Sequence, residues 1–274
     1  MKAKTRWFFG LLALALGVRA ETVVVAGTTV DVFLSGKPNS RTVIYVPGCN
    51  GKDEYGVRYQ KFHLMRIQKE FNDDVNVIMP QLVNDVTQGA KDGACFWDFE
   101  LQNTKVNSLV LARRVGDVLP WIKEQKWFNG TAHFFGFSQG GRVGLFINTI
   151  GKTRGFFKSA TLVWPNCLPR YRPPTLLEAH TPTRIYSTEN DPLSQPKNCP
   201  SFYSNPYLIE LKLYPGEMHS WATHPSNPPM KTFWTNYQIN VTQQYVTQYA
   251  DDMWSTWAIW AICMEQEGSC KQVN

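Results

Sequence analysis

Short apolar runs alternate with stretches of helical periodicity along most of the chain. Two runs, residues 22–26 and 29–34, flank Gly27 and Thr28 and predict an antiparallel hairpin. Strands that alternate with helices predict one α/β domain, with a mostly parallel sheet flanked by helices. Apolar runs of strand length follow at residues 42–46, 75–79, 132–137, 183–187 and 209–214, and helical patterns at residues 59–71 and 106–121.

The first twenty residues have the composition of an export signal. Lys2, Lys4 and Arg6 precede an apolar core at residues 7–17, and small residues precede a predicted cut before Glu21. The apolar core is shorter than the ~20 residues of a membrane-spanning helix, so we expect no stable membrane anchor. Residues 1–20 are therefore predicted to be a signal peptide and residues 21–274 a single domain, periplasmic or secreted.

Removal of this segment changes the meaning of the net charge. It contains four basic residues and no acidic residue, so the formal charge falls from +6 to +2. No block of Lys and Arg with interleaved aromatic residues remains, and such a block is typical of nucleic-acid binding. The composition therefore predicts no nucleic-acid partner.

The most informative motif is Gly136-Phe137-Ser138-Gln139-Gly140. A predicted strand precedes it, and apolar residues recur at helical spacing after it, which is the context of a nucleophile elbow. Such a turn exposes the serine hydroxyl, and the glycines allow the strand and the helix to pack closely. We therefore predict Ser138 as a nucleophile; the alternative is a glycine turn with an incidental serine.

A nucleophilic serine needs a base and an orienting acid, which follow it in the order acid, then histidine, in this architecture. Asp191 lies in the loop after the predicted strand 183–187 and is preferred to Glu189, because a shorter side chain followed by proline suits a fixed position. His219 follows the strand 209–214 and is preferred to His224. The chain order disfavours the other three histidines, which are His63, His133 and His180.

Two further groups of residues are expected around this site. The backbone N–H of Gln139 is the first predicted oxyanion donor, and the loop 47–51 offers Cys49 or Asn50 as the second, unless that loop is an ordinary Pro-Gly turn. Aromatic residues that follow strands near the site are candidates for a substrate-binding wall: Trp97, Trp164 and Trp221. By contrast, one face of the last predicted helix is expected to pack on the sheet, with Trp254, Trp257, Ala258 and Ala261.

Together these segments resemble the dienelactone hydrolase family of α/β-hydrolases. The resemblance runs from residue 42 to residue 221 and rests on the sequences GFSQGG, PGCNG, CFWDF, ENDPLSQPKNC and YPGEMHSW. It implies the α/β-hydrolase fold and the triad Ser138, Asp191 and His219. The chain departs from the family in two places, because founding members have cysteine at the position of Ser138 and many relatives have histidine at that of Pro47. Dienelactone is therefore not assigned as the substrate.

Six cysteines in an exported chain favour disulfides, and the sequence has no C-x-x-C or H-E-x-x-H pattern that would indicate a metal site. In the hydrolase sheet, loops that leave adjacent strands at one edge can meet. This topology predicts the bridges Cys49–Cys95 and Cys167–Cys199 and leaves Cys263 to pair with Cys270. The alternative is that some cysteines are unpaired and buried.

The sequence thus predicts an exported serine hydrolase that cleaves small-molecule carboxylic esters through an acyl-enzyme. This chemistry needs no cofactor. The alternatives are amide or peptide cleavage by the same triad, and a catalytically silent hydrolase fold that serves as a binding protein.

Overall fold

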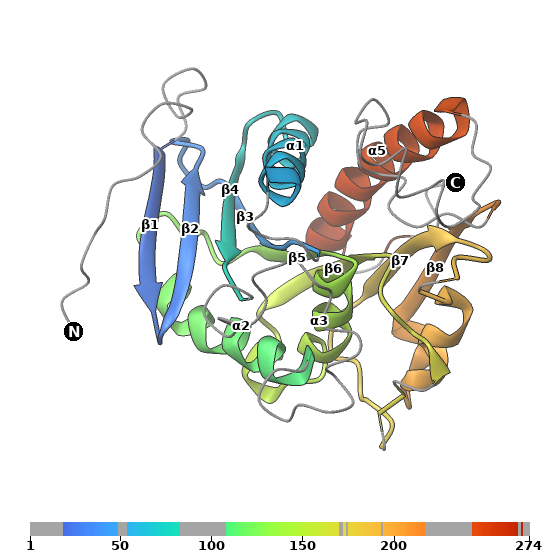
Figure 1. The fold of residues 1–274 in the computed structure, drawn as a ribbon. Helices are drawn as coiled ribbons and strands as arrows, with labels where there is room; N and C mark the ends of the chain where they lie inside the picture. The colour runs from blue at the N-terminus through green and yellow to red at the C-terminus, as the bar shows by residue number, and fades with distance from the viewer. Residues whose placement is uncertain are drawn as a thin grey trace.

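The computed structural model describes residues 19–48, 54–82, 108–169, 172–173, 175–192, 194–216, 243–267 and 270. Within these residues an eight-stranded sheet forms the centre of the molecule, in the order β1-β2-β4-β3-β5-β6-β7-β8 (Figure 1). The strands are β1 (Arg19–Val25), β2 (Thr28–Leu34), β3 (Arg41–Val46), β4 (Val75–Pro80), β5 (Ala132–Phe137), β6 (Phe157–Val163), β7 (Thr183–Thr188) and β8 (Ile209–Tyr214).

The sheet has an antiparallel part and a parallel part. β1 pairs with β2 and β2 with β4 in antiparallel fashion, while β4, β3, β5, β6, β7 and β8 are parallel to one another. The predicted hairpin and the mostly parallel sheet are both confirmed. β1 begins at Arg19, so Arg19 and Ala20, which precede the predicted cut, pair with Leu34 and Phe33.

The helices cover both faces of the sheet (Figure 1). α2 (Ser108–Lys123) and α3 (Gln139–Ile147) lie on one face, and α1 (Glu54–Glu70) and α5 (Gln243–Glu267) lie on the other. Short 3₁₀ helices complete the connections: η2 (Gly151–Thr153), η4 (Pro196–Phe202) and η5 (Pro206–Leu208). In the described part of the chain, no helix is long and apolar enough to cross a membrane.

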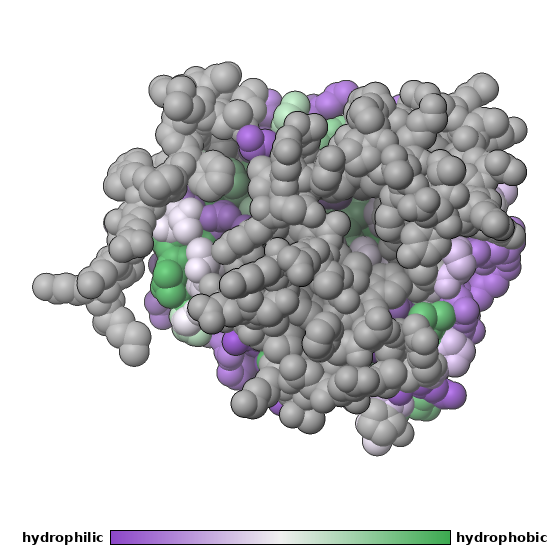
Figure 2. All heavy atoms as spheres, viewed as in Figure 1, coloured by the Kyte–Doolittle hydropathy of each residue, from purple (hydrophilic) through white to green (hydrophobic). Residues whose placement is uncertain are grey.

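Because both faces are covered, the central strands are apolar on both sides. In β5, Phe134 packs on the α2/α3 side, whereas Phe135 and Phe137 pack on the α1/α5 side. Each such aromatic side chain contributes roughly 1.5–3 kcal/mol to stability through burial. The outer hairpin differs, since hydrophobic surface is visible over β1 and β2 (Figure 2) and Val24 is 58% exposed.

The C-terminal helix packs on the sheet as the sequence predicts. Its predicted apolar face is buried, and the ring of Trp257 lies 4.0 Å from that of Phe135 between ring centroids. A disulfide joins Cys263 in α5 to Cys270, which confirms the predicted pair. The core role of these tryptophans is therefore confirmed.

Candidate active site

Ser138 occupies the turn between β5 and α3 and has a strained backbone. Its φ is 48° and its ψ is −109°, and the residue is partly exposed. Its N–H donates to the carbonyl of Val163 at 2.8 Å, which ties the turn to the end of β6. Positive φ at a non-glycine residue is costly and is typical of functional turns. The strand, turn and helix expected of a nucleophile elbow are all present.

Close backbone packing explains the glycines around this turn. A Cβ atom on Gly140 would lie 2.0 Å from the carbonyl oxygen of Val46, far inside van der Waals contact. A Cβ atom on Gly48 would lie 3.2 Å from the Cβ of Ser138. Gly48, two residues after the end of β3, therefore lies directly against Ser138. Cys49 and Asn50, the predicted second oxyanion donors, follow Gly48 but lie outside the described residues.

Gln139 begins helix α3 and connects it to α2. Its side chain is buried, and its Nε2 donates to the hydroxyl of Ser108, the first residue of α2, at 3.2 Å. The backbone N–H groups of the first turn of a helix have no partner inside that helix and carry partial positive charge. The backbone N–H of Gln139 is thus in the chemical setting required of an oxyanion donor.

Asp191 lies in the loop after β7 and is almost completely buried, with 1% of its surface exposed. Its Oδ1 accepts a hydrogen bond from the Ser194 N–H at 3.0 Å, and its Oδ2 accepts one from the Ser187 hydroxyl at 3.3 Å. Glu189, the alternative acid, is exposed. A buried carboxylate with fixed hydrogen bonds can orient a histidine ring better than a solvated one.

The elbow and the loop after β7 that contains Asp191 (the acid loop) lie at the same edge of the sheet. β5, β6, β7 and β8 are neighbours and run parallel, so Ser138 and Asp191 both follow carboxyl ends of strands. Beyond the strands, Glu189 donates its N–H to Tyr214 and Asn190 donates its N–H to Gly216, at 2.9 and 3.0 Å. The acid loop is therefore bonded to the segment that continues toward residue 219.

Several predicted site residues lie outside the described part of the chain. These are the base His219 and its rival His224, the aromatic residues Trp97 and Trp221, and the cysteine pair Cys49 and Cys95. The roles assigned to them stay predictions. Trp164 is described, and it lies beside the elbow with its ring 5.4 Å from that of Phe137 between centroids. However, only 1% of its surface is exposed and it belongs to the core under α5, so its described contacts are those of a packing residue.

Two of the disfavoured histidines, His63 and His133, are buried in the core. Burial lowers the pKa of His63 to about 3, and burial together with the charges of Arg41 and Lys158 lowers the pKa of His133 to about 3. His63 stacks on Phe137 and has its Nδ1 2.7 Å from the Tyr45 hydroxyl. Both rings are neutral near pH 7 and held by core contacts, which suits structural roles.

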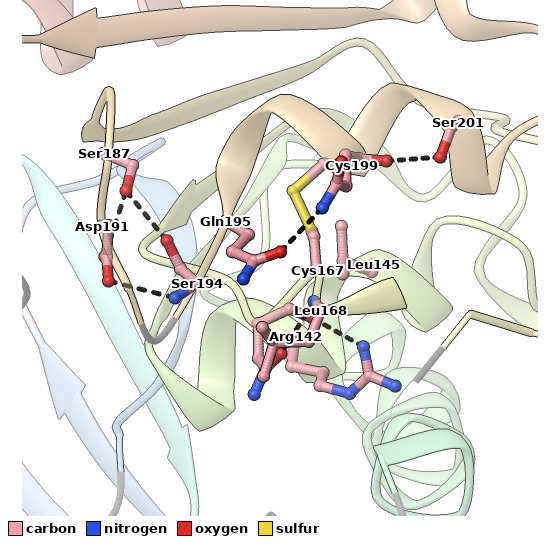
Figure 3. Close-up of a disulfide and its surroundings, with 12 residues drawn as sticks. Arg142, Leu145, Cys167, Leu168, Ser187, Asp191, Ser194, Gln195, Cys199 and Ser201 are labelled. Atoms are coloured by element: carbon pink, nitrogen blue, oxygen red, sulfur yellow. Dashed lines mark hydrogen bonds between the residues drawn. A yellow bond between two sulfur atoms is a disulfide. The ribbon is translucent and has the colours of Figure 1, made fainter. Parts of the chain in front are cut away.

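A disulfide braces the acid loop (Figure 3). Cys167, in the loop after β6, is bonded to Cys199 in η4, which confirms the predicted pair. The Cys167 N–H donates to the carbonyl of Ser194 at 2.7 Å, so the bridge is directly connected to a hydrogen-bond partner of Asp191. Nearby, buried Arg142 of α3 donates from Nη1 to the Asn166 carbonyl at 2.6 Å.

Reasoning from the sequence missed Ser187 and Ser194 as partners of the acid. A serine three residues after an aspartate is a recognisable signal, because an aspartate side chain often accepts a hydrogen bond from a backbone N–H two or three residues later. Ser187 has no comparable signal, since its contact depends on how the loop folds back over the end of β7. Among the described residues, no three His, Cys, Asp or Glu side chains are placed to share a metal ion.

The strand order, the strained turn between β5 and α3 and the helices on both faces of the sheet define the α/β-hydrolase fold. Solved structures that share this fold include a Klebsiella pneumoniae protein assigned to the dienelactone hydrolases, which is 12% identical with a TM-score of 0.62, over 91% of this chain and 99% of that one. A dienelactone hydrolase-like promiscuous phosphotriesterase from metagenomic libraries has 12% identity and a TM-score of 0.62, over 88% and 98% of the two chains. An esterase of Pyrococcus furiosus has 14% identity and a TM-score of 0.52, over 90% and 97%.

At these identities the likeness concerns the fold. No model of a known protein family matches the sequence, and no curated protein matches it. The predicted α/β-hydrolase fold is confirmed, and dienelactone hydrolases are among the proteins that share it.

Proposed function

We propose that the protein is an exported serine hydrolase that cleaves carboxylic esters with the triad Ser138, Asp191 and His219. The observation that carries the proposal is the partly exposed Ser138 on a strained turn, at the same sheet edge as the buried acid Asp191. The names of structures that share the fold include dienelactone hydrolases and an esterase, which also supports ester hydrolysis.

In the proposed mechanism, His219 accepts the proton of Ser138 while Oγ attacks the ester carbonyl. The negative charge that forms on the carbonyl oxygen is stabilised by the N–H of Gln139 and by a second N–H from Cys49 or Asn50. The intermediate collapses, the alcohol leaves with the proton from His219, and an acyl-Ser138 ester remains. Water, deprotonated by His219, then attacks this ester, releases the carboxylic acid and restores the serine.

Asp191 has two tasks in this scheme. It holds His219 in the tautomer whose free nitrogen faces Ser138, and it stabilises the imidazolium that forms. Its burial and its hydrogen bonds from Ser187 and Ser194 favour a fixed carboxylate for both tasks.

Export is proposed from the N-terminal segment together with the disulfides. The Cys167–Cys199 and Cys263–Cys270 bridges are compatible with an oxidising compartment, since such bonds persist in the periplasm or outside the cell.

Covalent labelling tests the proposed activity. A fluorophosphonate probe should label the wild-type protein, and Ser138→Ala should abolish labelling and ester hydrolysis. Ser201→Ala is the matched control, because Ser201 is exposed and donates only to the carbonyl of Asn198. A panel of chromogenic esters of varied acyl length, with one anilide, distinguishes esters from amides. An unlabelled wild-type protein would contradict catalysis and favour a binding protein.

The base can be tested separately by pH. Activity should fall as pH decreases through the titration of a free histidine, at about pH 6 to 7. A flat profile between about pH 5 and 8 would contradict His219 as the base.

A further inference from the structure

Ser187 in β7 and Ser194 and Asp191 in the loop after it are buried and form a hydrogen-bond chain that ends on the Asp191 carboxylate. The hydroxyls of Ser187 and Ser194 lie 3.0 Å apart, and the Ser187 hydroxyl lies 3.3 Å from Asp191 Oδ2. Both serines are fully buried. The triad chemistry itself uses neither hydroxyl.

The direction of this chain follows from proton counting. An ionised carboxylate only accepts hydrogen bonds, and each hydroxyl has a single proton to donate. Ser187 therefore donates to Asp191 Oδ2, and Ser194 donates to the oxygen of Ser187. Donation toward the carboxylate favours its ionised form, which is the form that orients a histidine.

The hydrogen-bond chain also limits rotation of the Asp191 carboxylate. The terminal torsion of an aspartate side chain is broad, so one hydrogen bond leaves the carboxylate plane free to turn. The Ser194 N–H holds Oδ1 at 3.0 Å, and Ser187 holds Oδ2. With both oxygens held, the plane of the carboxylate is fixed, and each oxygen keeps a lone pair for a further donor.

The disulfide anchors the far end of this chain (Figure 3). Ser194 accepts a hydrogen bond from the Cys167 N–H at 2.7 Å, and Cys167 is bonded to Cys199. The loop that contains Ser194 is thus held from β6 and from η4, independently of Asp191.

We propose that Ser187 is a positioning residue for the acid of the triad: its hydroxyl, supported by that of Ser194, sets the plane of the Asp191 carboxylate toward the base. This inference rests on the proposed function. It assigns no direct contact with substrate to Ser187, which acts through Asp191.

The test compares Ser187→Ala with the matched control Ser201→Ala. Ser187→Ala should lower kcat for a chromogenic ester, and the rate of fluorophosphonate labelling, on the order of 10- to 100-fold, with little change in KM. Ser187→Thr, which keeps the hydroxyl, should recover most of the loss. Thermal unfolding of each variant is followed by circular dichroism, so that a folding defect is separated from a loss of orientation.

A double-mutant cycle tests whether Ser187 acts through the acid. In the Asp191→Asn background, Ser187→Ala should change kcat by less than about twofold. If Ser187→Ala fails to fold, Ser194→Ala replaces it in the cycle, because this variant keeps the backbone donor and removes only the supporting hydroxyl.

Two outcomes overturn the inference. One is a kcat of Ser187→Ala equal to that of the Ser201→Ala control. The other is an equal loss of kcat on Ser187→Ala in the wild-type and the Asp191→Asn backgrounds, which indicates a purely structural role. If Ser138→Ala keeps full activity, the proposed function itself fails, which is a distinguishable result.

Discussion

A serine lies near a carboxylate at each end of strand β5, but only the carboxyl end has the exposed turn that the proposed catalysis needs. Near the amino end, His133 has its Nδ1 2.8 Å from the Ser159 hydroxyl and its Nε2 4.0 Å from the Glu265 carboxylate. After the carboxyl end comes Ser138, with Asp191 at the same edge of the sheet. Residue types alone therefore do not identify a reactive serine.

The difference lies in backbone geometry and burial. Ser159 is fully buried within β6, at the position that pairs with His133, so no substrate can reach its hydroxyl. The Glu265 carboxylate is held by Arg41 through an ion pair of 2.5 Å. A pKa of about 3 also makes His133 a poor base near pH 7. At the other end, Ser138 lies on a turn with φ of 48° and is partly exposed.

The largest expected effect is a difference in kcat between substitutions of Asp191 and of Glu189, the two carboxylates of the acid loop. Asp191→Asn should lower kcat by about 10⁴-fold, because the wrong histidine tautomer is then stabilised. Glu189→Gln is the control, since Glu189 is exposed, and it should change kcat by less than about twofold. Steady-state ester hydrolysis measures both. A larger loss in Glu189→Gln would reverse the assignment of the acid.

The second prediction concerns the disulfides. Replacing Cys167 and Cys199 by serine should lower the free energy of unfolding by about 3.7 kcal/mol, whereas the same change at Cys263 and Cys270 should lower it by about 2.4 kcal/mol. The difference arises because the first bridge spans 32 positions of sequence and the second spans 7. Urea unfolding at constant pH checks the order. Equal losses would show that loop closure is not the main source of stability.

A smaller effect is expected where the elbow packs against β3. Gly140→Ala should lower the free energy of unfolding by about 3 kcal/mol, because the added Cβ collides with the backbone oxygen of Val46. Gly151→Ala is the matched control, since nothing lies within 4 Å of a Cβ at that position. A Gly140→Ala protein as stable as this control would contradict the close packing of the elbow.

The smallest effect concerns pH and the amino end of β5. The pKa of His133 is depressed from 6.5 to about 3, so below pH 6.5 the unfolded chain takes up a proton that the folded protein does not. Above pH 6.5 this histidine therefore does not reduce the free energy of unfolding. Below pH 6.5 it lowers the free energy of unfolding by about 1.4 kcal/mol per pH unit as pH falls toward 3. His63 adds a similar term.

His133→Gln should remove one of these two terms. Urea unfolding at about pH 5 and pH 7 should show a smaller pH dependence in this variant, by up to about 2 kcal/mol, with ester hydrolysis at pH 7 unchanged. An unchanged pH dependence would mean that His133 is protonated in the folded protein.

The parts of the fold bounded by turn signals could be predicted well. The bounds of β5 and β8 match the predicted runs, because Asn129 and Gly130 precede the first and Pro215 and Gly216 follow the second. Helix α1 begins five residues earlier than the predicted start at residue 59. Gly56 lies in this first part and weakens the helical pattern there.

The site was predictable only in part. Ser138 and Asp191 could be placed at one edge, since each follows a parallel strand. The orientation of Trp164 could not be foreseen, because its φ of 49° ends the alternation of β6 and turns its side chain to the same face as that of Val163. The contacts of Ser187 and Ser194 depend on loop closure across many residues, which a local pattern does not contain.

The bonds from Glu189 to Tyr214 and from Asn190 to Gly216 extend the β7–β8 ladder beyond both strands. These hydrogen bonds join residues 189–190, just before Asp191, to the segment at the end of β8. A displacement of one of these two segments is therefore expected to move the other with it. In the proposed hydrolase, a change in substrate size can therefore be accommodated by moving both segments together relative to Ser138.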